Sequence, residues 1–290
     1  DPFEFTVIKT IDFINSQFNK NINNPFKEGL SINTGWNWGK DFWQRIGVGY
    51  VDNNGIKYNL EHINIDGEHE VNNQRYKVKG SRQKLGISFI PFSNWEISGE
   101  INYKDNFLYI DSNKLNQEYI TYNLSVVWSK YGDLSFKIIS GNSLNSSQPN
   151  YLKYTLDYSS KVNLESNNNL IYSLHTGFTS INTPINYQFH GGGFSKLSLR
   201  GHNYNMAGNR YFTGTVEYHH KIFNNFNGIL FFDSGKIIPV DKSISEVDWI
   251  FDPGIGFSYN TSLGEPLRID IGYDLTQNTY NWHIGLGHTF

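Results

Sequence analysis

The sequence predicts an all-β fold: a closed antiparallel transmembrane β-barrel of about 14 strands. The first observation is that apolar and polar residues alternate in most segments from residue 29 to the C-terminus, as in a sheet with one face in water. The second is that many apolar stripes end in Tyr or Trp, which is typical of the aromatic girdles of membrane barrels. The third is that short connections alternate with mostly long ones, as they do at the two ends of such barrels. The long connections are predicted at residues 67–75, 105–117, 141–149, 180–209 and 236–249.

The composition is compatible with this fold and excludes several other classes of protein. The mean hydropathy of -0.49 and the lack of an apolar run of about 18 residues exclude a helical membrane span, but not a barrel, whose strands turn only every second residue to lipid. The chain has no Cys, which excludes disulfides, thiolate zinc sites and cysteine nucleophiles. Its net charge is only -3, so the sequence predicts no nucleic-acid partner.

Residues 1–28 do not alternate, and they predict a short N-terminal amphipathic helix ahead of a barrel over residues 29–290. Apolar residues recur there at helical spacing. They are Val7, Ile8, Ile11, Ile14 and Phe18. Such a helix would lie on the inner leaflet or plug the mouth of the barrel. The alternative is a disordered tether.

Fourteen segments of period two follow, beginning with one in which Leu30, Ile32 and Trp36 share a face. The segments cover residues 29–38, 46–50, 56–61, 84–89, 95–103, 120–128, 134–138, 152–158, 170–178, 212–218, 230–233, 254–259, 267–275 and 280–290. An even number returns both ends of the barrel to one side. Alternatives of 12 or 16 strands stay open, because the segments near 36–43 and 105–118 could pair differently.

A soluble β-sandwich or β-barrel would also alternate. The faces opposite the apolar stripes argue against it, because they carry Gly, Ser, Asn and scattered charges rather than a second apolar set. The interior is therefore predicted to be wet. Six charged residues are predicted to point into this interior, where they would set ion selectivity if a pore exists. They are Arg45, Lys57, Glu61, Lys84, Glu96 and Glu100.

Motifs in the last hundred residues form an ordered set. They are Leu199-Arg200-Gly201-His202, Gly208-Asn209, Thr215-Val216-Glu217-Tyr218, Phe231-Phe232-Asp233-Ser234-Gly235, Gly254-Ile255-Gly256-Phe257, Glu265-Pro266-Leu267-Arg268-Ile269-Asp270 and the terminal Gly285-Leu286-Gly287-His288-Thr289-Phe290. This set resembles the bacterial surface-antigen superfamily, which comprises the BamA insertases, TamA and Toc-like relatives, and the TpsB two-partner secretion transporters. The rest of the chain resembles the family only by its alternation.

The resemblance implies that the long loop over residues 180–209, called the lumen loop below, folds back into the barrel. The arginine of the family's VRG(F/Y) motif corresponds to Arg200, followed by Gly201, and its acidic partners correspond to Glu217 and Asp233. The alternation independently places both carboxylates on the inward face, where a guanidinium can form charge-assisted bonds to them. The alternative is that these are ordinary lumen charges. His202 departs from the motif, which has an aromatic residue there.

The resemblance further implies insertion or translocation of polypeptide, or handling of lipid, in the bacterial outer membrane. The route would be a lateral seam between the first and last predicted strands, marked by Leu30, Ile32, Gly285 and Gly287, and Phe290 would be the assembly signal. The implied partners are outer-membrane lipid, a polypeptide or lipid substrate and the barrel-assembly machinery, with a homodimer left open. Alternatives are a passive porin-like channel and the membrane anchor of a secreted patatin-like enzyme.

Two departures from the family bear on these expectations. Members usually carry periplasmic POTRA modules, and residues 1–28 are too few to form one. The usual barrel also has more strands than the alternation indicates. The chain is therefore expected to be either a naturally short member or the barrel of a longer protein.

Other residue clusters gave no catalytic, metal or cofactor site. His190-Gly191-Gly192-Gly193 resembles an esterase oxyanion loop, but the chain has no G-x-S-x-G nucleophile motif. The adjacent His219 and His220 point to opposite faces of a strand and cannot share a metal. A set of outer-loop residues could gather a divalent cation, although a solvated loop tip explains it better; these are Glu61, His62, Glu68, His69 and Glu70.

Overall fold

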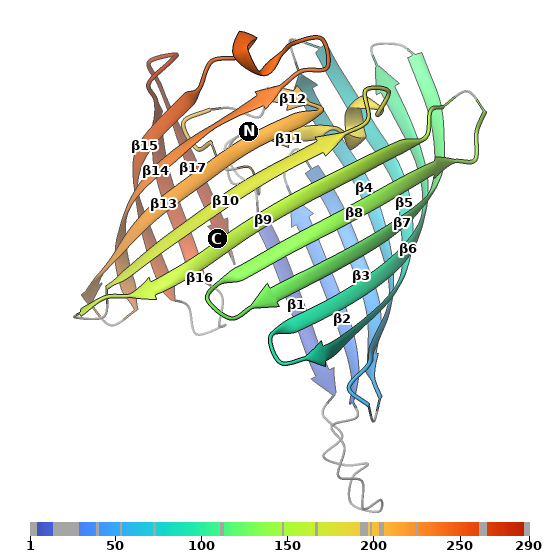
Figure 1. The fold of residues 1–290 in the computed structure, drawn as a ribbon, viewed down its shortest axis with the longest axis horizontal. Coiled ribbons are helices and arrows are strands. Elements are labelled where there is room, and N and C mark those ends of the chain that lie inside the picture. Colours follow the sequence, from blue (N-terminus) through green and yellow to red (C-terminus); the bar gives the residue numbers. More distant parts are fainter. Residues whose placement is uncertain are drawn as a thin grey trace, which may run out of the picture.

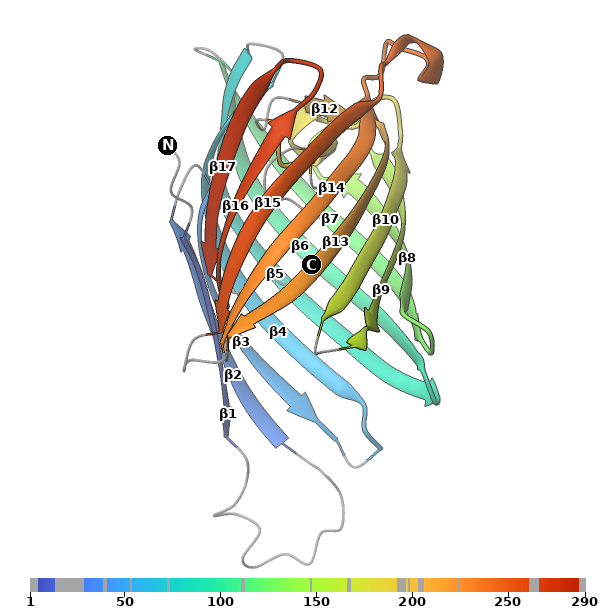
Figure 2. The same cartoon turned by 90° about the vertical axis from the view of Figure 1, so that its left-hand side faces the viewer.

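The computed structural model describes most of the chain as a single curved β-sheet. The described residues are 5–13, 29–38, 41–52, 54–71, 74–110, 113–146, 148–165, 168–191, 197, 199–202, 206–223, 225–260 and 266–286. Within these residues, fifteen strands form one sheet, and two short strands form a second. Figures 1 and 2 show the large sheet curling round into a barrel.

The strands of the large sheet follow one another in sequence order, and each pairs antiparallel with its neighbour. They are β1 (Phe5–Phe13), β2 (Gly29–Trp38), β3 (Asp41–Val51), β4 (Lys57–Val71), β5 (Gln74–Phe92), β6 (Trp95–Ile110), β7 (Asn113–Ser129), β8 (Asp133–Ser143), β9 (Tyr151–Asn163), β10 (Asn169–Thr179), β13 (Arg210–Phe223), β14 (Phe226–Ile238), β15 (Ile250–Asn260), β16 (Pro266–Asp274) and β17 (Thr279–Leu286). Each of the fourteen predicted segments overlaps one of these strands, and residues 287–290 of the last segment lie outside the described residues.

The faces of the sheet are inverted relative to a soluble protein. Large apolar side chains point outward and are exposed, as for Tyr122 at 47% and Ile269 at 40%. Polar side chains on the alternate positions, such as Asn102 and Thr121, are buried inside. This arrangement places apolar residues against lipid and polar residues in the lumen, as predicted. Among the residues that the structure describes, none forms a helix with the length and apolarity needed to cross a membrane.

The predicted N-terminal helix is wrong for residues 5–13, which form β1 and pair with β2 along their whole length, with Ile11 opposite Ile32. Many of these residues are β-branched and favour a strand. Pairing with β2 also satisfies a strand edge that would otherwise be open, which outweighs the helical spacing of the apolar residues. Ile14 and Phe18 lie outside the described residues.

The extra strand changes the parity of the barrel. Because fifteen successive strands alternate in direction, the edge strands β1 and β17 run the same way, whereas the predicted even number would make them antiparallel. β1 and β17 contact one another, and Figure 2 shows them along the same side of the barrel. Within the described residues, the hydrogen-bonded order of the large sheet ends at these two strands.

Two connections expected to be long loops, residues 67–75 and 105–117, are mostly strand, because β4 to β7 are 15 to 19 residues long. The extended ends of β5 and β6 carry the inward residues Tyr76, Val78 and Leu108. These side chains pack against Ala207 of the lumen loop. Burial of apolar surface inside the barrel therefore stabilises the longer strands.

The lumen loop carries its own small elements, η3 (Ile185–Tyr187), β11 (Phe189–Gly191) and β12 (Met206–Gly208). β11 and β12 pair into a hairpin that lies within the barrel (Figures 1 and 2). A further short helix, η4 (Ile244–Glu246), lies in the connection between β14 and β15.

Candidate functional site

Aromatic packing holds the first part of the lumen loop against the barrel wall. The Tyr187 ring stacks on Tyr151 at a centroid distance of 5.1 Å and meets Tyr119 edge-on at 5.1 Å. Asn106 donates a hydrogen bond of 3.1 Å to the Tyr187 hydroxyl. Such aromatic contacts add stabilisation beyond the area that they bury, so η3 is fixed in place.

The hairpin of β11 and β12 packs on strands β13 and β14. The Phe189 ring lies 4.4 Å from the ring of Tyr211, and both belong to a buried cluster with Leu197 and Ile237. Leu197 of this cluster lies two residues before the segment 199–202. Leu199 and Arg200 are fully buried there.

Arg200 projects from the lumen loop into a set of carboxylates on three strands. Its Nε and Nη2 donate to the two oxygens of Asp233 on β14 at 2.7 and 2.6 Å. Its Nη1 donates to Glu217 on β13 at 2.6 Å and to Asp270 on β16 at 2.9 Å. The guanidinium carbon also lies 3.4 Å from the ring centroid of Phe231. The side chain therefore combines bidentate pairing with a cation–π contact.

A second arginine completes the cluster. Arg268 on β16 donates through Nη2 to Glu217 at 2.8 Å and through Nε to Asp270 at 2.9 Å. Two guanidinium groups thus share three buried carboxylates, and we call these five residues the arginine cluster: Arg200, Glu217, Asp233, Arg268 and Asp270. His219 also bonds to Glu217 at 2.7 Å.

The cluster keeps Arg200 charged. Burial lowers the pKa of its guanidinium, but the charges of Asp233, Glu217 and Asp270 and the hydrogen bonds to Asp233 raise that pKa above its ordinary value overall. A buried charge is tolerated only where it is paired and hydrogen-bonded, and both conditions hold here. Removing one partner would leave another charge uncompensated.

Glycine on the strands lets the loop backbone approach the barrel wall. Gly272 lies on β16, where a Cβ would come within 2.5 Å of the carbonyl carbon of Arg200 and 2.6 Å of the nitrogen of Gly201. Gly201 is equally confined, because its own Cβ would lie 2.6 Å from the backbone nitrogen of Asp274. Both positions require glycine because of close approach rather than because of a special backbone angle.

The edge strand β17 also holds the loop. Asn281 donates through Nδ2 to the carbonyl of Gly201, and Nε2 of His283 lies 2.9 Å from the carbonyl oxygen of Arg200. On β15, Asp252 accepts a hydrogen bond of 2.8 Å from the backbone nitrogen of Gly201. The residues around Arg200 therefore connect the loop to β13, β14, β15, β16 and β17.

Of the predicted site residues, the structure brings Arg200, Gly201, Glu217 and Asp233 together. Sequence reasoning did not assign Arg268, Asp252, Asp270, Asp274, Asn281 or His283 to the site. The alternation already placed Arg268, Asp270 and Asp274 on one polar face. No local signal distinguished them from other inward charges, because their meeting depends on the register of strands across the sheet.

The predicted seam residues are placed differently. Leu30 and Ile32 lie on β2, which pairs with β1 on one side and β3 on the other, so these residues do not line the edge of the sheet. Gly285 lies on β17 opposite Arg268. Gly287 and Phe290 lie outside the described residues.

The other candidate clusters have packing partners. His190 lies between the Tyr76 hydroxyl, 3.3 Å away, and the carbonyl of Ile185, 2.8 Å away, while Gly192 and Gly193 lie outside the described residues. His220 lies 3.0 Å from Asn168, away from His219.

In the outer-loop set, Glu61 pairs with Lys84 at 3.0 Å and His62 contacts Asn64 at 3.0 Å. Both side chains therefore have partners on neighbouring positions of the sheet. The side chains of residues 68–70 lie outside the described set.

A polar cavity of about 320 Å³ lies beside the lumen loop. Its lining includes Arg82, Lys104, Lys137, Lys153 and Glu100. The excess of positive charge favours anions in this part of the lumen.

Comparison with known proteins gives the same fold. One similar solved structure is BamA from Haemophilus ducreyi lacking POTRA domains 1-3, with a TM-score of 0.66 and 12% identity; the match covers 96% of this chain and 65% of that chain. Another is CdiB from Escherichia coli, with a TM-score of 0.64 and 13% identity; the match covers 96% of this chain and 61% of that chain. CdiB from Acinetobacter baumannii has a TM-score of 0.61 and 14% identity over 97% and 58%. The chain thus spans less than two thirds of the length of these relatives.

No curated protein matches the chain in sequence. Residues 24–290 match the model of the Omp85 superfamily domain. The match covers β2 to β17, including the lumen loop, and it confirms the resemblance seen in the motifs. The chain therefore belongs to the Omp85 superfamily of outer-membrane β-barrels.

Proposed function

We propose that this barrel inserts polypeptides into the outer membrane, or passes them across it, by opening between β1 and β17 while the arginine cluster holds the lumen loop. The proposal is supported by the family of the chain, which is an Omp85 barrel similar to BamA and CdiB. Barrels of this class take part in transport or assembly rather than in catalysis. The substrate would be a polypeptide, and the barrel would be surrounded by outer-membrane lipid. The barrel-assembly machinery would insert the protein itself into the membrane.

The observation that carries the proposal is the link between the buried loop and an edge strand. Arg200 is held by β13, β14 and β16, and its carbonyl oxygen is contacted by His283 of β17. A loop fixed so firmly inside the lumen does not suit a permanently open conduit. A movement of β17 would instead be transmitted to the loop, and a movement of the loop to β17.

The edges themselves support a lateral route. Backbone groups on the free edge of a strand can pair with another strand, which is how extended peptides add to sheets. Since β1 rather than β2 forms the first edge, the proposed seam moves to β1 and β17. β2, which carries the predicted seam residue Ile32, is paired on both sides and is therefore no longer part of the proposed seam.

The test is insertion of an unfolded outer-membrane barrel protein into vesicles that contain the reconstituted chain, scored by protease protection. A disulfide that ties β1 to β17 should abolish insertion, and reduction should restore it. The matched control joins Ile11→Cys to Ile32→Cys, which are opposite one another on β1 and β2 and leave the seam free. Insertion that continues with the seam tied would refute the lateral route.

A passive channel is the second candidate, favoured by the positively charged lumen cavity next to Lys104 and Lys153. Single-channel recording separates the two functions. A steady, anion-selective conductance in the unchanged protein would support the channel. A small conductance that rises when Arg200→Ala frees the loop would support the gated barrel.

A further inference from the structure

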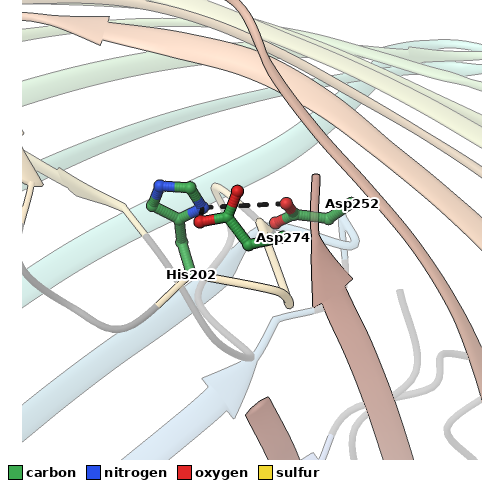
Figure 3. Close-up of side chains that lie close together, drawn as sticks. All are labelled: His202, Asp252 and Asp274. Atoms are coloured by element: carbon green, nitrogen blue, oxygen red, sulfur yellow. Dashed lines mark ion pairs between the residues drawn. The ribbon is translucent and has the colours of Figure 1, made fainter. Parts of the chain in front are cut away.

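Next to the arginine cluster, three buried side chains converge from separate parts of the fold. They are His202 of the lumen loop, Asp252 of β15 and Asp274 at the end of β16 (Figure 3). Asp252 and Asp274 are fully buried and His202 is 7% exposed. One ligand-type atom from each lies within 4.8 Å of the other two. We propose that these residues bind one divalent cation of the zinc class and thereby fasten the loop a second time.

The atoms that face the centre of this group form no hydrogen bond within the described residues. Nδ1 of His202, Oδ1 of Asp252 and Oδ2 of Asp274 are each buried without a hydrogen-bond partner there. Nδ1 lies 2.7 Å from Oδ2 of Asp274 and 3.7 Å from Oδ1 of Asp252. Both distances lie within ion-pair range (Figure 3), but neither contact has hydrogen-bond geometry, and a cation between the three atoms accounts for their approach.

The opposite atoms of the same side chains are held by their surroundings. Oδ2 of Asp252 accepts from the nitrogen of Gly201 at 2.8 Å, and Oδ1 of Asp274 accepts from the nitrogens of Thr276 and Gln277 at 2.7 and 3.0 Å. The Gln277 amide lies 3.4 Å from Nε2 of His202. This is the outer layer of contacts that orients metal ligands, and it leaves one oxygen of each aspartate free to coordinate.

Charge gives an independent reason for a cation. In the part of the chain that the structure describes, the two aspartates adjoin the arginine cluster, where three carboxylates meet two guanidinium groups. Five buried carboxylates beside two arginines leave an excess of negative charge, and buried charge without compensation is costly. A divalent ion bound by His202, Asp252 and Asp274 would neutralise the two aspartates.

The ligand set indicates the class of ion. One imidazole nitrogen and two carboxylate oxygens suit Zn²⁺, which binds both at about 2.0 to 2.2 Å. Two such ligands of a tetrahedral ion lie about 3.3 Å apart by that geometry, close to the separations of 2.7 and 3.7 Å from His202. Ca²⁺ and Mg²⁺ prefer oxygen ligands alone and a larger number of them. A water molecule can take the fourth position.

The experiment measures zinc in the purified full chain, refolded in detergent micelles, treated with chelator, supplied with Zn²⁺ and desalted. Elemental mass spectrometry should find one zinc per chain. His202→Gln and Asp274→Asn should each weaken binding by roughly 100-fold or more, since loss of even an outer contact costs 10- to 100-fold. The matched control is His175→Gln, which removes a lumen His–Asp pair with an Nδ1–Oδ1 distance of 2.8 Å and should keep the zinc.

Several results would overturn the assignment. These are no retained zinc in the unchanged protein, equal zinc in His202→Gln and in the unchanged protein, or binding of Ca²⁺ in preference to Zn²⁺. If a variant fails to refold, Co²⁺ bound to the unchanged protein tests the site instead. A tetrahedral site of nitrogen and oxygen ligands gives Co²⁺ a characteristic visible absorption band, and the absence of that band would contradict the assignment. The readout is metal content, so it stands or falls separately from polypeptide insertion.

Discussion

The Arg200→Ala substitution tests the arginine cluster most directly. The guanidinium makes four side-chain hydrogen bonds, and its removal affects the three carboxylates unequally. Glu217 and Asp270 keep Arg268 as a partner. Asp233 loses its charged partner and keeps two neutral donors, the Thr215 hydroxyl at 2.9 Å and the backbone nitrogen of residue 200 at 3.1 Å. The substitution therefore leaves one buried carboxylate without a countercharge.

Removing one member of a buried ion pair costs about 3 to 5 kcal/mol. If this cost falls on the docked loop, the equilibrium between docked and released loop shifts by roughly 10²- to 10⁴-fold, since about 1.4 kcal/mol is tenfold. Hydrogen exchange measures such local opening. Backbone amides of residues 199–202 and of β12 should exchange faster by that factor, while amides in the middle of β7 and β8 should not change.

Arg210→Ala is the matched control. Arg210 also lies at the lumen-loop end of β13, but its Nη2 donates to the carbonyl of Lys242 in an exposed position. An exposed contact of this kind contributes little, so loop exchange should stay as in the unchanged protein. Unchanged exchange in Arg200→Ala, or equal acceleration in both variants, would show that the Arg200 guanidinium does not hold the loop.

Three further predictions follow from the packing of the sheet. Gly272→Ala should loosen the loop as Arg200→Ala does, because the added Cβ meets the Arg200 backbone at 2.5 Å; loop hydrogen exchange measures it. Ile11→Cys with Ile32→Cys should form a disulfide in the folded barrel, since the two residues are directly opposite and the chain has no other Cys; gel mobility without reductant shows it. Leu124→Lys on the lipid-facing side of β7 should destabilise the barrel by about 2 to 4 kcal/mol in vesicles, measured by denaturant unfolding.

Each of these predictions has its own control. Gly99→Ala should be neutral, because the nearest atom to its Cβ is 3.9 Å away. Lys9→Cys with Ile32→Cys should not cross-link, since Lys9 lies opposite Thr34. Leu144→Lys, at an exposed position after β8, should not reduce stability. A control that behaves like its test variant would contradict the corresponding contact.

The N-terminal segment shows where sequence reasoning reaches its limit. The spacing of Val7, Ile8 and Ile11 fits a helix, yet these residues form β1. The spacing of residues within one segment carries no information about the edge of β2, with which β1 pairs along its whole length. β2 is also separated from β1 in the sequence by residues 14–28. Strand formation there is decided by a contact between segments rather than by a property of one segment.

Alternation of period two is a local property, because successive side chains of a strand must point to opposite faces. For that reason the sequence alone determined the positions of fourteen strands, the lipid-facing stripes and the inward direction of Glu217 and Asp233. Tertiary structure alone decided which inward residues meet. Asp252, Asp270 and Asp274 join Arg200 and His202 only because the register of adjacent strands and the path of the lumen loop bring them to one level of the barrel, and register is set by pairing across the whole sheet.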